Sequence, residues 1–232
     1  AGDFAAALGA AQRHADRLED APLLLGKLQA IDDPAAARLH FEQADSDLAR
    51  QYLAALDQPE AALRAMLLGR LYLAGGELPL AQRAFEAAVA ANPAYAEAHA
   101  YTGFVIDEQG GDGAAELDRA AALDADLIVA RYFRARHALA RGQIDQAMSD
   151  LEEAARLDQQ NPLIAAELGR AHLLRGELPE AEQWLKRARD ARSDDASAWL
   201  ALAELYAGRI YGPRDQAVSV AQEAVRRAPQ TA

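Results

Sequence analysis

The sequence predicts an all-α fold, an α-solenoid of stacked antiparallel helix pairs. One series of small residues recurs at steps of 34, 32, 34 and 34 residues: Gly69, Gly103, Ala135, Gly169 and Ala203. A series of alanines recurs at steps of 32, 34, 34 and 36 residues: Ala88, Ala120, Ala154, Ala188 and Ala224. Small side chains at a fixed period allow two helices to approach closely in every unit, and a period of this length is typical of helical repeat arrays.

The composition suits such an array and argues against several functions. The chain has 232 residues, 51% hydrophobic composition and a formal net charge of −12. Nucleic-acid binding depends on neutralising phosphates, so we expect no nucleic-acid partner. The chain has no cysteine, which excludes disulfides and thiolate metal sites. No run approaches the roughly 20 apolar residues of a membrane span, and no signal peptide is visible at the N-terminus.

Residues 62–95 show the helix pair most clearly. Apolar or small residues recur every three or four positions, which predicts two buried helix faces. Gly75 and Gly76 separate the two helices, and Asn92 ends the second helix because the residue before a proline avoids the helical region. The positions that define the pair are Ala65, Leu68, Gly69, Tyr72, Gly76, Ala81, Phe85, Ala88 and Pro93.

Four more pairs follow the same framework. The turn at 109–113 is two residues shorter than the first turn, and the turn at 208–213 is two residues longer, which accounts for every irregular step in the two series. The sequence therefore predicts five repeats, at about 62–95, 96–127, 128–161, 162–195 and 196–229.

These positions closely resemble the tetratricopeptide repeat (TPR) family, with Ala65 standing where the family usually has tryptophan. The resemblance covers residues 62–229. It implies a right-handed superhelix in which the first helix of each pair lines a concave groove that binds proteins or peptides.

Residues 1–61 are less regular. Residues 2–8 look like the second helix of a repeat, and prolines then punctuate three short helices at about 22–31, 35–44 and 47–57, the last with Ser46 as its N-cap. We expect degenerate helix pairs that continue the array. Because neither end shows a capping helix, we also expect a fragment of a longer protein that self-associates through uncapped ends.

No residue pattern predicts catalysis, a cofactor or a metal site. The histidines have no metal-ligand spacing, and His99 and His172 stand at positions where a repeat carries a large packing residue. Residues 110–113 are glycine-rich, but they lack the strand and the Lys-Ser/Thr of a phosphate-binding loop, so a turn explains them.

The resemblance places the candidate binding residues on the first helices. Arginines at equivalent positions can hold carboxylates, and aromatic residues near them supply contact area. The predicted groove residues are Met66, Arg70, Tyr101, Phe104, Tyr132, Arg136, Arg170 and Glu204. The Lys and Asn residues with which some TPR proteins hold chaperone C-termini are missing here. A solvated surface of arginines, without a ligand, is the alternative interpretation.

The sequence thus predicts a non-enzymatic scaffold that binds a protein or peptide segment, without a cofactor. Three alternatives stay open: a structural, self-associating module, the substrate-recruiting arm of a larger enzyme or of a secretion or assembly machine, and a pentatricopeptide RNA-binding array. The acidic charge counts against the last of these.

Overall fold

The fold is all-α over the residues that the structure describes. The structure is a computed structural model and describes residues 2–15, 20–44, 46–191, 196–207 and 214–227. Fourteen helices and no strand occur in these ranges. None of these helices is both long and apolar enough to cross a membrane. The chain divides into two compact units, residues 1–124 and 125–232.

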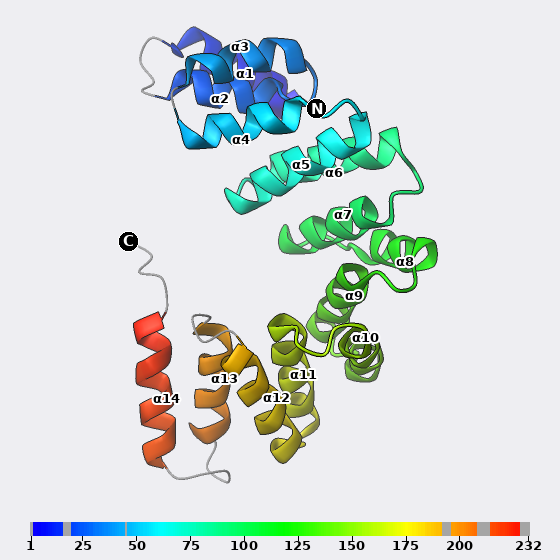
Figure 1. The fold of residues 1–232 in the computed structure, drawn as a ribbon, viewed down its shortest axis with the longest axis vertical. Helices are drawn as coiled ribbons and strands as arrows, with labels where there is room; N and C mark the ends of the chain where they lie inside the picture. Colours follow the sequence, from blue (N-terminus) through cyan, green and yellow to red (C-terminus); the bar gives the residue numbers. More distant parts are fainter. Residues whose placement is uncertain (1, 16–19, 45, 192–195, 208–213, 228–232) are drawn as a thin grey trace. The chain divides into compact units, whose positions relative to one another are not determined.

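The first unit contains three helix pairs and two further helices (Figure 1). The pairs are α2–α3, α5–α6 and α7–α8, whereas α1 precedes them and α4 stands alone between the first two pairs. The helices of this unit are α1 (Gly2–Arg13), α2 (Ala21–Gln29), α3 (Pro34–Gln43), α4 (Asp47–Leu56), α5 (Ala61–Ala74), α6 (Leu78–Ala91), α7 (Ala96–Glu108) and α8 (Ala114–Leu123).

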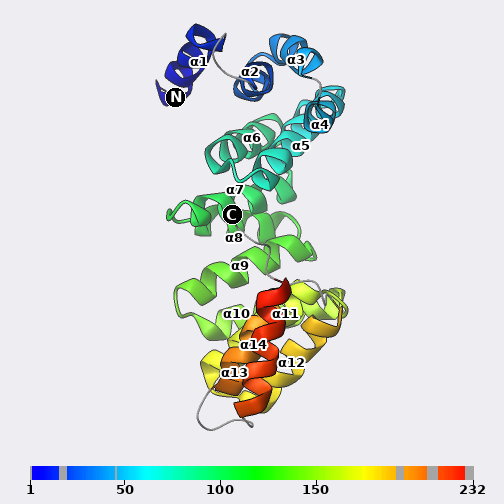
Figure 2. The ribbon, with the colours of Figure 1, turned by 90° about the vertical axis from the view of Figure 1, so that its left-hand side faces the viewer.

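The second unit contains three helix pairs, and a short turn joins the two helices in each of the first two pairs. Views from two sides show α13 and α14 packed side by side (Figures 1 and 2). The helices of this unit are α9 (Ile128–Ala140), α10 (Ile144–Leu157), α11 (Pro162–Arg175), α12 (Leu178–Ala191), α13 (Ala196–Ala207) and α14 (Arg214–Arg227). The turn before α14, which the sequence predicts to be lengthened, lies outside the described residues.

A glycine with positive φ turns the chain between the two helices of four pairs. The φ angles lie between 72° and 78° at Gly76, Gly110, Gly142 and Gly176. In each turn the following residue donates its backbone N–H to a carbonyl five residues earlier, for example Glu177 to His172 at 3.0 Å. This is the Schellman pattern, which satisfies free carbonyls at a helix end and favours glycine because a Cβ atom is disfavoured there.

The small residues of the first series lie at close helix crossings, as the sequence predicts. A Cβ atom added to Gly169 would lie 2.5 Å from Cγ of Leu185, and one added to Gly103 would lie 2.7 Å from Cγ of Leu117. Gly26 has the same role, because its Cβ would lie 2.5 Å from the ring of Phe41. The pair α2–α3 is therefore packed like the later repeats.

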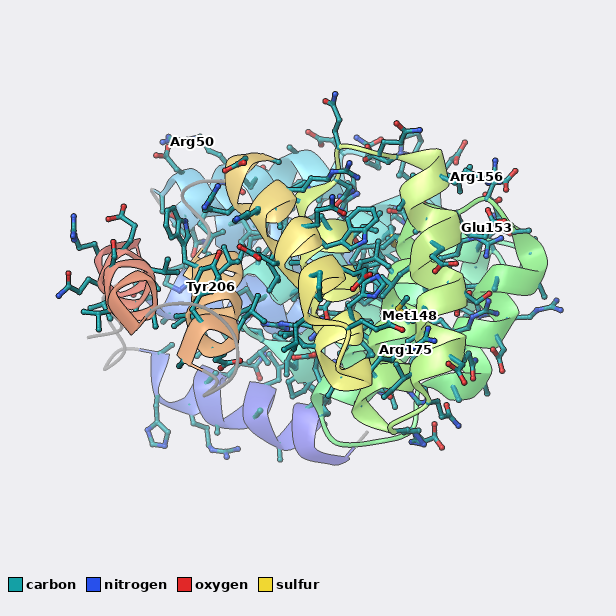
Figure 3. The ribbon with its side chains drawn as sticks, turned by 90° about the horizontal axis from the view of Figure 1, so that it is seen from below. Arg50, Met148, Glu153, Arg156, Arg175 and Tyr206 are labelled. Atoms are coloured by element: carbon teal, nitrogen blue, oxygen red, sulfur yellow. The ribbon has the colours of Figure 1, made fainter. Side chains whose placement is uncertain are left out.

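The core of each unit follows from these crossings. In the first unit one cluster joins α2 to α7 and contains the stacked rings of Phe41 and Tyr52, whose centroids are 4.9 Å apart. In the second unit Met148 of α10 packs with Ile164 and Leu168 of α11. Figure 3 shows Met148 on the inner side of α10, whereas Glu153 and Arg156 point away from the neighbouring helices.

The two histidines predicted to be packing residues are buried or nearly so. His99 of α7 is 7% exposed; its Nδ1 lies 2.6 Å from a carboxylate oxygen of Glu116 on α8. His172 of α11 pairs in the same way with Glu177, at 2.7 Å. His99 therefore links the two helices of its pair, and His172 links α11 to the turn that follows it.

Candidate functional site

The candidate site is the surface of the first helices, which we call the first-helix surface and describe separately in each unit. Its members in the first unit are Arg70, Tyr101 and Phe104; in the second unit they are Tyr132, Arg136, Leu163, Arg170, Leu174, Leu200 and Glu204. In the second unit α11 contacts both α9 and α13, so the three first helices are neighbours (Figure 1).

In the first unit the structure brings Arg70 and Tyr101 together. The guanidinium of Arg70 on α5 lies 5.8 Å from the ring centroid of Tyr101 on α7 and 3.6 Å from a carboxylate oxygen of Glu97. The Tyr101 ring stacks on Phe85 with a centroid distance of 5.1 Å. Burial raises the pKa of the Tyr101 phenol, Arg70 opposes the rise and Glu97 adds to it. Phe104 is half-buried and packs against the core of the unit.

A groove lies beside Arg70, between α4 and α5. Its volume is about 380 Å³. Four residues of α4 and its C-terminal end and three of α5 line it: Gln51, Ala54, Ala55, Gln58, Leu67, Arg70 and Leu71. We call this the α4–α5 groove. Its walls are apolar or amide-bearing apart from the single arginine.

Met66 is not on this surface, which corrects the sequence prediction. Its side chain is 1% exposed and belongs to the core cluster, together with Ala49, Tyr52 and Ala55 of α4. Because α4 packs on α5, it covers the position that the repeat pattern assigns to a groove.

In the second unit apolar and charged side chains alternate along one face of α11. Leu163, Arg170 and Leu174 are spaced by seven and four residues, so they lie on the same side of the helix. All three are exposed, and Arg170 lies 3.3 Å from Glu167 within its own helix. Leu200 and Glu204 of α13 are both exposed and are four residues apart, which places them on one face too.

The remaining predicted residues of the second unit lie on α9. Tyr132 is half-buried, packs against the core cluster and has its ring centroid 5.6 Å from that of Phe133. Arg136 is half-buried one turn further along the helix. These two residues are therefore less exposed than Arg170 of α11.

Sequence reasoning missed the residues that α4 contributes. Gln51, Ala54 and Gln58 lie outside the five predicted repeats, in a segment that we expected to form a helix pair. The signal was present in the preceding pair, where Gly26, Ala37, Phe41 and Ala44 reproduce the pattern of Gly69, Ala81, Phe85 and Ala88 with one residue fewer. Once α2 and α3 are paired, α4 has no partner of its own.

Comparisons with known proteins agree with this architecture. Two family models, both described as tetratricopeptide repeat, match residues 66–128 and 138–205, which together are more than half of the chain. The chain belongs to the tetratricopeptide repeat family. No curated protein matches the sequence significantly.

Solved structures show the same fold at low sequence identity. The Cut9–Hcn1 hetero-tetramer of the APC/C is similar to 89% of this chain, with a TM-score of 0.69 and 20% identity, over 42% of the matched chain. The protein pilF of Pseudomonas aeruginosa matches 91% of this chain and 92% of its own, with a TM-score of 0.60 and 20% identity. YrrB, described as a TPR protein with an unusual peptide-binding site, matches 81% of this chain and 95% of its own, with a TM-score of 0.52 and 18% identity.

Proposed function

We propose that the protein is a non-enzymatic interaction scaffold that binds a protein or peptide segment on its first-helix surface. The observation that carries the proposal is the exposed apolar stripe of the second unit. Leu163 and Leu174, on the same face of α11 as Arg170, and Leu200 of α13 are between 39% and 58% exposed. Apolar side chains grouped beside charged ones are typical of surfaces that bind another molecule.

The charges on this surface favour a partner with carboxylates. Arg170 is about half exposed, and the Glu167 that it contacts is nearly buried. A guanidinium can hold a carboxylate with two parallel hydrogen bonds and can also stack on a ring. The partner that fits combines aliphatic side chains with Asp, Glu or a chain terminus. The peptide-binding site for which YrrB is described is consistent with this proposal.

The test is affinity capture with a double variant, Arg136→Ala with Arg170→Ala. The matched control, Arg156→Ala with Arg187→Ala, removes two arginines from the second helices α10 and α12. We expect the first variant to lose partners that the wild type and the control retain, because one charged hydrogen bond contributes about 1.5–3 kcal/mol. If all three proteins capture the same partners, the arginines are a solvated surface and the proposal fails.

A second candidate function is a structural module that associates with itself. The observation that favours it is the exposed apolar face of α14, with Val218 56% and Val225 74% exposed. Such a face attracts another apolar surface. Sedimentation at several concentrations separates this function from peptide binding.

A further inference from the structure

The α4–α5 groove has a chemical character that differs from the rest of the acidic chain. The chain carries a net charge of −12, yet the only charged residue lining the groove is Arg70. The other lining residues are aliphatic, except for the amides of Gln51 and Gln58. The groove therefore offers one positive charge beside an apolar floor.

The contacts of Arg70 leave its guanidinium available to a ligand. The side chain is 54% exposed, and Glu97 approaches only to 3.6 Å, beyond hydrogen-bond distance. The ring of Tyr101, 5.8 Å away, lies to one side of the guanidinium and restricts its position. An arginine held in this way keeps N–H donors for a carboxylate.

The dimensions of the groove suit a short extended segment. Gln51 and Gln58 are seven residues apart on and just after α4, which corresponds to about 10 Å along a helix axis. An extended peptide rises about 3.3 Å per residue, so about three residues fit between the two amides, and side chains two residues apart point to the same side. An amide at each end of the wall can bond the peptide backbone on both sides, which favours a chain that passes through over one that ends there.

We propose that the α4–α5 groove binds an internal peptide segment with an aliphatic side chain and, two residues away, an aspartate or glutamate. The aliphatic side chain packs between Ala54 of α4 and Leu67 and Leu71 of α5. The carboxylate accepts hydrogen bonds from Arg70. This inference rests on the proposed scaffold function. It specifies the partner chemistry of one site, a groove that exists because α4 packs beside α5.

The experiment measures binding of a fluorescent peptide by anisotropy. The probe is Ala-Ala-Leu-Ala-Glu-Ala-Ala, acetylated and amidated at its ends; a second peptide has Gln in place of Glu, and a third has Ala in place of Leu. The proteins are the wild type, Arg70→Gln, and Ala54→Glu, which places a carboxylate in the groove. Arg50→Gln is the matched control, because Arg50 lies on α4 outside the groove and pairs with Asp47. Thermal unfolding by circular dichroism verifies that each variant is folded.

We expect the wild type and Arg50→Gln to prefer the Leu-x-Glu probe over both altered peptides. Arg70→Gln should weaken the probe roughly 10-fold or more while leaving the Gln peptide unchanged, as expected for a direct charged hydrogen bond. Ala54→Glu should weaken the probe as well.

Three outcomes overturn the inference: no binding of the probe by the wild type, equal binding of the Glu and Gln peptides, or equal losses for both peptides in Arg70→Gln. A fourth peptide, which ends in a leucine with a free carboxylate, tests the alternative ligand. If it binds more tightly than the probe, Arg70 binds a chain terminus and not an internal acidic side chain, and the inference is also overturned. The capture experiment with Arg136 and Arg170 concerns the second unit, so the scaffold proposal can survive any of these results.

Discussion

At the residue scale, Gly169 shows how one missing methyl group determines the approach of two helices. Helix propensity alone predicts that Gly169→Ala stabilises α11 by about 1 kcal/mol. The new Cβ, however, would lie 2.5 Å from Cγ of Leu185 on α12. We expect this overpacking to dominate and to lower the free energy of unfolding by about 1–3 kcal/mol, measured by urea titration.

The control for this prediction is Gly9→Ala on α1. The nearest atom to its added Cβ is the flexible Nη1 of Arg13, at 3.3 Å, so the substitution should be neutral or stabilising. Leu185→Ala combined with Gly169→Ala should show coupling, since the two side chains share one space. A stabilised Gly169→Ala protein would contradict the assigned role of this glycine.

Two buried tyrosines predict how stability depends on alkaline pH. Burial is the main cause that raises the pKa of both Tyr52 and Tyr72, and Glu77 adds to the rise. Tyr72 donates its hydroxyl to the carbonyl of Lys27 at 2.7 Å. Above about pH 10 the unfolded chain releases phenol protons that the folded chain keeps. The unfolded state then binds fewer protons, so stability that is complete below about pH 10 falls as the pH rises further.

The measurement is thermal unfolding between about pH 8 and pH 11, with Tyr52→Phe and Tyr72→Phe combined as the comparison. The wild type should lose midpoint temperature more steeply above about pH 10 than the variant does. At the lower pH the variant should be less stable by about 1 kcal/mol, because the bond from Tyr72 is lost. Parallel pH profiles would exclude this contribution of the tyrosines.

At this scale the sequence predicted small residues better than exposed ones. Gly69, Gly103 and Gly169 were predicted from period alone, because any larger side chain in a regular crossing collides with its partner helix. Met66 was assigned to the surface by the same period, and that was wrong, since its exposure depends on α4 and not on its own repeat. The repeat period therefore predicts which residues touch within a helix pair. It does not predict which residues an additional helix such as α4 buries.

At the scale of elements, an ion pair with a buried carboxylate joins α9 to α10. Asp150 of α10 is 3% exposed and accepts hydrogen bonds from Nε of Arg134, at 2.7 Å, and from Nη2 of the same arginine. Arg131 lies 3.7 Å from the same carboxylate. Removing the carboxylate takes away the acceptor that Arg134 bonds with two nitrogens.

We expect Asp150→Ala to lower the free energy of unfolding by about 1–3 kcal/mol, because a buried acceptor of charged hydrogen bonds is lost from partly exposed arginines. Asp47→Ala is the control, because Asp47 forms an exposed pair with Arg50 on α4 and its loss should change stability little. Chemical denaturation of both variants makes the comparison. Equal, small losses would mean that this ion pair contributes no more to stability than the exposed pair on α4.

The helices themselves were largely predictable, whereas their pairing in residues 1–61 was not. The short helices at about 22–31, 35–44 and 47–57 are confirmed, and the hydroxyl of Ser46 caps α4 by accepting the N–H of Ala49 at 3.1 Å. Prolines and capping residues act locally, so they mark helix ends in one sequence. Whether α4 joins a pair depends on packing with α3 and α5, which the local pattern does not contain.

At the scale of the whole molecule, the repeat period implies which helix faces need a neighbour. Met148 of α10 packs on α11, and the equivalent residue of α12, Glu182, accepts a hydrogen bond from Tyr206 of α13 at 2.6 Å. Arg189 of α12 lies 5.5 Å from the ring centroid of Trp199 on α13. The equivalent positions of α14 are Val218 and Val225, 36 residues after Glu182 and Arg189. These valines therefore stand on the face that α10 and α12 use to bind the following helix.

Because both valines are exposed, we expect the protein to associate with itself through this face of α14. Sedimentation velocity should show a sedimentation coefficient that rises with concentration for the wild type. Val218→Gln combined with Val225→Gln should abolish the rise, whereas Ser219→Gln, exposed on the same helix, should keep it. Hydrogen exchange adds an independent measurement, since a helix with one open apolar face should exchange faster than α11 when the protein is dilute. If the wild type stays monomeric at every concentration, and residues 214–227 exchange as slowly as α11, then α14 is stable without a neighbour and this prediction is wrong.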